Sequence, residues 1–71
     1  MIDIRNLKVL GFKDMHESQV EAITDLVGLT LNLASLTGDE DILASAEAAC
    51  DEMVQLFGGN GVRVVVDVHW P

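Results

Sequence analysis

The segment from Val62 to Trp70, VRVVVDVHW, constrains the fold more than any other stretch, because apolar and polar residues alternate along it almost without a break. One face, counted by twos, holds Val62, Val64, Val66, Val68 and Trp70. The other face holds Arg63, Val65, Asp67 and His69. A period of two predicts a β-strand with one buried face. The rest of the chain must therefore cover the valine face and offer the strand a pairing partner.

The first residues also alternate, but their apolar parity changes. Ile2 and Ile4 are even-numbered, whereas Leu7 and Val9 are odd-numbered. A strand cannot move its apolar residues to the other parity without an extra residue. We therefore predict a β-bulge or a turn at Asn6. The segment is either one bulged strand or two short strands, and it ends near residues 11–12.

A first helix is predicted to run to about Leu36. Asp14 and Ser18 each stand three residues before a glutamate, which is the capping-box spacing, so either could start it. Two apolar seams follow helical spacing; one comprises Ala22, Leu26, Leu29, Leu33 and Leu36, and the other Val20, Ile23, Val27, Thr30 and Ala34. Apolar coverage this wide predicts that two sides of the helix are contacted, for instance by a sheet and by another helix.

The stretch TGDE predicts the boundary to a second helix. Gly38 ends the first helix, Thr37 is the expected cap of the second, and Glu40 stands at the capping-box position. An apolar seam at 3-4 spacing follows, made of Leu43, Ala46, Cys50, Met53 and Phe57. The glycines of GGNG end this helix just before the last strand.

These elements predict one α+β domain over residues 1–71 in the order β-α-α-β. The short joint between the helices favours an antiparallel helical hairpin. The first and last strands then become antiparallel neighbours. We expect a two-layer fold in which a small antiparallel sheet of two or three strands is covered on one face by the hairpin.

A chain of 71 residues needs support beyond its own core, because so short a domain buries only about 60% of its unfolded surface. One cysteine excludes an internal disulfide, and no Cys/His cluster offers a zinc site. The last strand has no lysine and no proline before Pro71, so its edge invites another strand. We predict a homodimer formed through the outer strand face, namely Arg63, Val65, Asp67 and His69. Alternatively, the N-terminal segment covers one edge and polar side chains protect the other.

Charge is distributed unevenly along the chain. The formal net charge is −8, and from Asp14 to Val62 there are ten acids and no lysine or arginine. This segment is unsuited to binding nucleic acid phosphates or anionic lipid, which require cationic contacts. The acids serve solubility, or they meet a basic protein partner. The candidate partner-binding residues are Glu40, Asp41, Glu47, Asp51 and Glu52.

No catalytic, cofactor-binding or metal-binding residue is predicted. Cys50 lies on an apolar seam among acids, which favours packing over reactivity. GGNG precedes a strand, whereas phosphate-binding loops precede a helix. An uncharged patch made of Gly28, Asn32 and Ser35 could admit another backbone closely, or the glycine is a kink or is merely tolerated.

Three classes of function remain open. The first is a small, acidic, non-enzymatic regulatory or inhibitory protein that binds a protein partner. The second is a nucleic-acid mimic that blocks the basic groove of a DNA- or RNA-binding protein. The third is a small oligomeric enzyme or ligand-binding subunit with a site between chains. A cytoplasmic location is expected, because the N-terminal MIDIRNLK lacks the apolar stretch of a signal peptide and the cysteine is unpaired.

Overall fold

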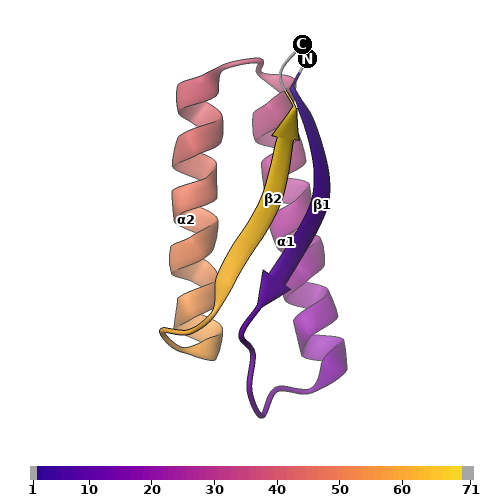
Figure 1. Cartoon of the computed structure of the whole chain (residues 1–71), viewed down its shortest axis with the longest axis vertical. Coiled ribbons are helices and arrows are strands. Elements are labelled where there is room, and N and C mark those ends of the chain that lie inside the picture. Colours follow the sequence, from indigo (N-terminus) through magenta and orange to yellow (C-terminus); the bar gives the residue numbers. More distant parts are fainter. Residues whose placement is uncertain (1, 70–71) are drawn as a thin grey trace.

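The four elements follow the predicted order in a computed structural model that describes residues 2–69. They are β1 (Asp3–Leu10), α1 (Glu17–Leu36), α2 (Glu40–Gly58) and β2 (Arg63–His69). The two helices form an antiparallel hairpin, and β1 and β2 lie side by side across it (Figure 1). The β-α-α-β prediction is therefore confirmed. Trp70, which was expected to continue the valine face, lies outside the described residues.

The sheet has two antiparallel strands, and β1 is a single bulged strand. Arg5 is opposite Asp67 and Lys8 is opposite Val65, so two residues of β1 face one residue of β2. Asn6, at the bulge, has a φ of 55°. Its side-chain amide donates a hydrogen bond of 2.9 Å to the Asp67 carboxylate. The extra residue explains the change of apolar parity along β1.

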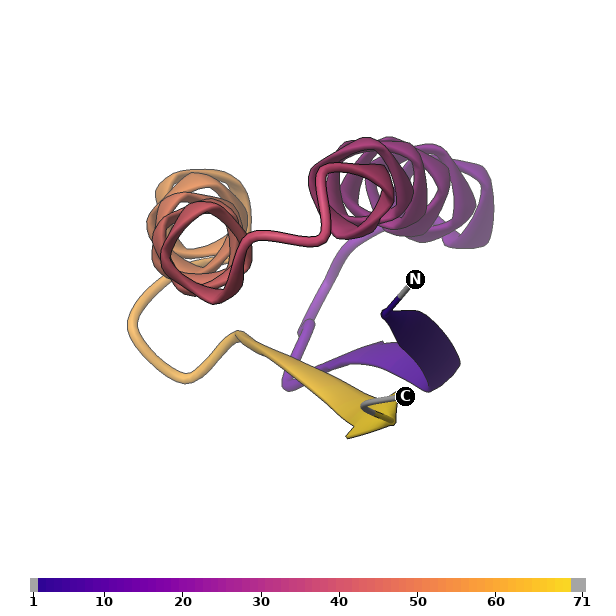
Figure 2. The ribbon, with the colours of Figure 1, turned by 90° about the horizontal axis from the view of Figure 1, so that it is seen from above.

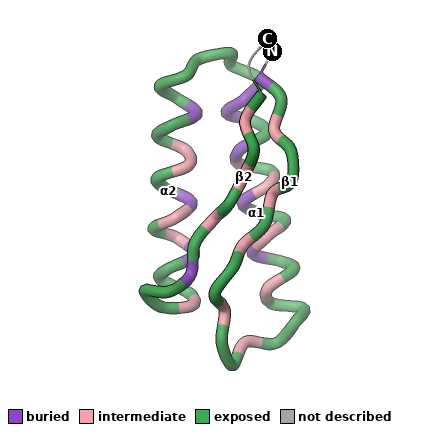
Figure 3. Tube along the Cα trace, viewed as in Figure 1, coloured by how far each residue is buried: buried purple, intermediate pink, exposed green. Residues whose placement is uncertain are grey.

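The helices form one layer and the strands the other (Figure 2). α1 packs over β1, and α2 packs over β2. Between the layers lies a small core in which the largest fully buried side chains are Leu31, Val27, Val54 and Val62. Figure 3 shows the buried positions spaced at intervals along both helices, as expected for one inward-facing stripe on each. The other described valines on the inner face of β2, namely Val64, Val66 and Val68, are half-buried. The odd-numbered residues of β2, which form its outer face, are exposed.

The start of α1 differs from the prediction. His16 is the N-cap, and its Nδ1 accepts a hydrogen bond from the backbone N–H of Ser18. The Gln19 side chain accepts from the His16 N–H at 3.3 Å, which completes a capping box. Asp14 lies before the helix with a φ of 56°, a conformation that cannot open a helix. The prediction overlooked the imidazole nitrogen as an acceptor, and neither Asp14 nor Ser18 is the cap.

The start of α2 is also one step from the prediction, since Asp39 is the N-cap and Thr37 is not. The Asp39 carboxylate accepts from the N–H of Asp41 at 2.9 Å. Thr37 instead ends α1, where its hydroxyl donates to the carbonyl of Ala34. Gly38, with a φ of 70°, reverses the chain between them, so the extended residue that precedes α2 is Asp39.

The two apolar seams of α1 differ in how far they are buried. Three members of the second seam, Ile23, Val27 and Ala34, are buried, together with Leu31 and Ser35. The leucine seam is exposed throughout. On α2, Leu43 and Cys50 are buried as predicted, but Phe57 is exposed and the fully buried Val54 was missed.

Candidate protein-binding surface

The most prominent surface feature is a row of exposed aliphatic side chains on the helical hairpin. We call it the hairpin face; it comprises Leu26, Leu29, Leu33 and Leu36 of α1 and Ile42, Ala49 and Leu56 of α2. The exposed fractions of the four leucines of α1 are 47%, 59%, 58% and 65%. Ile42 is 47% exposed and Leu56 is 88% exposed. Large aliphatic side chains are usually buried, and therefore a group of six that are exposed together needs an explanation.

Helical geometry places the α1 leucines on the side away from the sheet. Gly28 marks the sheet side, because a Cβ built there would lie 3.1 Å from the Leu7 side chain of β1. At about 100° per residue, the leucines lie roughly 80–160° around the helix axis from Gly28. They are also separate from the buried stripe that contains Val27 and Leu31.

The α2 row points the same way. Ile42, Ala49 and Leu56 recur every seven residues, which is about two helical turns, so they form a single row. Asp51 marks the sheet side of α2, because it bonds to the backbone of β2. The row lies roughly 140–180° around the axis from Asp51. Since the helices lie next to each other in one layer, both rows belong to one surface (Figure 2).

The hairpin face is uncharged, but carboxylates border it. Glu21 and Asp25 follow its outer margin on α1, and Asp41 and Glu52 follow its outer margin on α2. All four side chains are exposed. The segment from Asp14 to Val62 has no lysine or arginine, so no cation interrupts this border.

The hairpin face is large for so small a protein. The exposed fractions of its leucines and isoleucine add up to roughly three and a half fully exposed residues. At about 150 Å² for each large apolar residue, the patch covers about 500 Å². Phe57, 59% exposed at the end of α2, lies about 100° around the helix from Leu56 and is not counted in this area. The largest apolar patch on an ordinary monomer is about 300–600 Å² and is often functional.

The five acids predicted to bind a partner do not form one exposed row. Asp51 is half-buried, and its carboxylate accepts a 2.9 Å hydrogen bond from the N–H of Val64. Glu40 and Glu47 share that sheet-facing side of α2, whereas Asp41 and Glu52 lie on the outer margin. The structure therefore divides this set between two sides of the helix.

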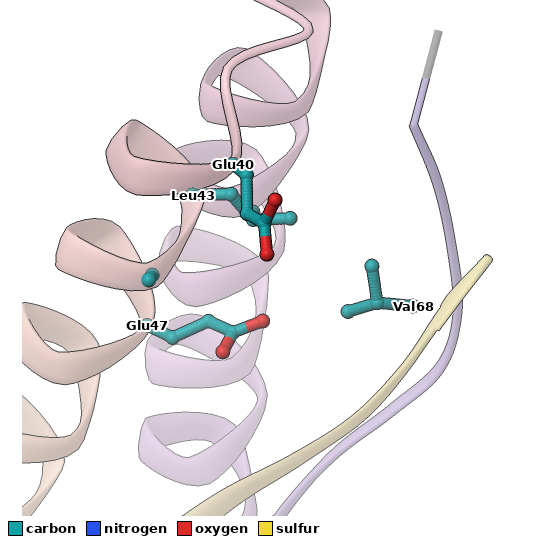
Figure 4. Close-up of a pocket in the computed structure, with 5 residues that line it drawn as sticks. Glu40, Leu43, Glu47 and Val68 are labelled. Atoms are coloured by element: carbon teal, nitrogen blue, oxygen red, sulfur yellow. The ribbon is translucent and has the colours of Figure 1, made fainter. Parts of the chain in front are cut away.

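Glu40 and Glu47 project from α2 toward Val68 of β2 (Figure 4). With Leu43 and Ala44 they line an open hollow of about 280 Å³ between the helix and the strand. N–H groups alternate in direction along a strand, so those of Val66 and Val68 point toward the same edge as that of Val64. Part of the β2 edge is thus covered by Asp51, and the part beyond it borders this acidic hollow.

The outer strand face is mainly polar. Arg63, Val65, Asp67 and His69 are all exposed, and Val65 is 39% exposed. Asp67 accepts the hydrogen bond from Asn6. On neighbouring β1, Arg5 forms an exposed ion pair of 2.7 Å with Asp3. The Asn6–Asp67 hydrogen bond joins the two strands, whereas the Arg5–Asp3 pair lies within β1. The role of this face in self-association stays a prediction.

Gly28, Asn32 and Ser35 occupy the flank of α1 near β1. Gly28 leaves room for the Leu7 side chain. Ser35 is buried, and its hydroxyl donates a 2.7 Å hydrogen bond to the carbonyl of Asn32, which is itself exposed. The close approach that glycine allows here is to a side chain of this chain's own sheet, and an approach by another chain stays a prediction.

Cys50 lies in the core, where burial raises the pKa of its thiol, and the nearby Asp51 and Glu47 carboxylates raise it further. A thiol that keeps its proton is a poor nucleophile. Within residues 2–69, no group of three or more His, Cys, Asp or Glu side chains is placed to hold a metal ion. No helix in the described part of the chain is long and apolar enough to cross a membrane.

Sequence reasoning identified half of the hairpin face and missed the other half. It predicted that the leucine seam of α1 would be contacted, but no other described element of this chain covers it. It did not single out Ile42, Ala49 and Leu56, although their seven-residue spacing was readable.

Comparison with protein-family models, with curated proteins and with solved structures found no match for this chain. The fold and the surface by themselves define a class: a small two-layer α+β protein with a polar outer sheet face and an uncharged, leucine-rich hairpin face.

Proposed function

We propose that this protein is a non-enzymatic regulatory or inhibitory protein that acts by binding another protein chain through the hairpin face. The observation that carries the proposal is the solvent exposure of four leucines on one side of α1, bordered by no cation. Exposed aliphatic surface gains free energy when it is removed from water, at about 25 cal/mol per Å². A second protein surface is the simplest source of that burial.

The distribution of acids supports a protein ligand over a nucleic acid or a membrane surface. Every charged residue bordering the hairpin face is a carboxylate, and phosphates would be repelled. The border also limits which proteins can dock, because a misplaced acidic surface would meet repulsion. A cytoplasmic location is part of the proposal, and the unpaired Cys50 is compatible with it.

The test compares two charge-introducing variants in the native host. Leu29→Glu places a carboxylate on the hairpin face, and Val65→Glu places the same group on the outer strand face as a matched control. We expect endogenous complexes, followed by size-exclusion chromatography of a cell extract, to be lost with Leu29→Glu and kept with Val65→Glu. If both variants elute in the same complexes as the unmodified protein, the hairpin face is not the binding surface.

A further inference from the structure

We infer that the chain covering the hairpin face is a second copy of this protein, packed face to face about a two-fold axis. The four helices would then form the centre of the dimer, and the two sheets would lie on its outside. This inference rests on the proposed function and names the partner for the same surface.

The area of the hairpin face fits a stable symmetric dimer. Its large side chains alone expose about 500 Å² per copy. A standard interface removes about 800 Å² per partner. Thr30 and Ser45 lie beside the face and add to this area, which then reaches the low end of the range for specific interfaces, about 600 Å² per partner. Such a dimer would also extend a core that is small within one copy.

Charge also selects this face for contact between copies. Each copy carries a net charge of −8, so contact between two identical surfaces meets the least repulsion where those surfaces are uncharged. The hairpin face meets that condition. Pairing through the β2 edge would instead bring a second copy beside Glu40 and Glu47, which point toward Val68.

The shape of the face suits packing of helix on helix. Ala49 lies at the middle of the α2 row, between Ile42 and Leu56, and is the smallest side chain of the face. Leucines of the facing helix can insert there, as ridges enter grooves in four-helix packing. Two-fold symmetry makes the same patch serve both partners, so no complementary second surface is required.

The acidic border predicts an unusual response to salt. In the dimer, the border carboxylates of one copy, including Asp25 and Asp41, approach those of the other, and added salt screens this repulsion. Self-association should therefore tighten as ionic strength rises. A basic partner on the same face would respond in the opposite sense, because salt weakens attraction between unlike charges.

Sedimentation equilibrium of the purified full chain tests the inference. We expect a dimer at micromolar concentration whose Kd falls between low and moderate salt. Leu33→Glu removes an apolar contact from both copies and adds two like charges, so Kd should rise by about 100-fold or more. The matched control Val65→Glu should leave Kd within a few-fold. Because Leu33 is exposed, both variants should keep the helical circular dichroism of the unmodified chain.

Three results would overturn the inference. The first is a monomer at all concentrations and salts. The second is a dimer that Val65→Glu dissociates and Leu33→Glu does not, which would place the interface on the strand face. The third is association that weakens with salt. A monomeric purified chain whose native complexes are still lost with Leu29→Glu would reject the second copy and retain the proposed function. If Leu33→Glu loses its helical signal, Leu33→Ala replaces it, with the same order of Kd values required.

Discussion

Replacing Asp51 with alanine removes the side chain that fastens α2 to the beginning of β2. Its carboxylate accepts a 2.9 Å hydrogen bond from the N–H of Val64, at the edge of β2 that β1 does not cover. A hydrogen bond to a charged group contributes about 1.5–3 kcal/mol, and a half-buried site belongs at the low end. Alanine is the better helix former by up to about 0.7 kcal/mol, which offsets part of the loss.

We therefore expect Asp51→Ala to lower the free energy of unfolding by about 1 kcal/mol. For a domain of this size that corresponds to a fall in Tm of about 4–8 °C. Thermal and urea unfolding followed by circular dichroism at 222 nm would measure the change. Protein concentration must be held constant, since self-association would itself raise Tm.

Glu52→Ala is the matched control, because it removes the same charge from the next residue of the same helix. Glu52 is exposed, and its side chain makes no hydrogen bond within the described residues. Asp51→Asn keeps a carbonyl oxygen as an acceptor, so it should fall between Asp51→Ala and the unmodified protein. Equal unfolding midpoints for Asp51→Ala and Glu52→Ala would refute the reasoning and return Asp51 to the set of freely available acids.

Three further perturbations test other parts of the fold. Gly11→Ala should lower the free energy of unfolding in urea by more than Gly59→Ala. Both glycines have a φ of 96°, but only at Gly11 would the new methyl group meet the backbone of the segment before β2. Equal losses of stability would show that the strained φ alone matters. Val64→Lys should unfold the domain, because it places a charge on the inner sheet face, whereas Val65→Lys should leave the fold intact. Circular dichroism would measure the helical signal of both variants. Burial, with a lesser effect of neighbouring carboxylates, raises the pKa of the Cys50 thiol above its ordinary 9.0. The unfolded chain therefore loses this proton first, so the stability that the protonated thiol contributes is complete below about pH 9 and declines as pH rises through the raised value. Unfolding midpoints measured from pH 7 to 10.5 should fall less steeply in Cys50→Ala, and identical slopes would contradict the assignment.

The strands were readable from the sequence because each carries its own period. The change of parity between Ile4 and Leu7 predicted an interruption at Asn6, and the structure has its bulge there. The interruption could have divided the segment into two strands. It remains one strand because β2 pairs with it continuously on both sides of the bulge. Pairing between distant segments is not contained in local spacing.

The helix caps were less readable, because several polar residues near each start could have accepted the same hydrogen bonds. Histidine is not among the residue types that usually cap helices, yet the imidazole of His16 and the side chain of Gln19 form the capping box. Thr37 and Asp39 are both good caps by type. The positive φ of Gly38 decides between them.

The hairpin face shows a different limit. A helix with two apolar seams predicts two contacts, but periodicity does not reveal whether the second contact comes from the same chain. The seam that contains Ile23 and Val27 meets the core, while the seam that contains Leu29 and Leu33 meets solvent in this chain. The pattern alone therefore does not identify the molecule that would cover the second seam.

The pairing of the first strand with the last also determines when this protein can fold during its synthesis. Asp3 pairs with His69, so β1 is made first and waits for nearly the whole chain before its partner emerges. At about 5–20 residues per second, that wait lasts several seconds. The helices form within microseconds from local contacts. Fast formation does not make these helices stable, because each packs on a strand of the sheet, so β1 and the inner stripes of both helices stay without their packing partners until β2 has been made.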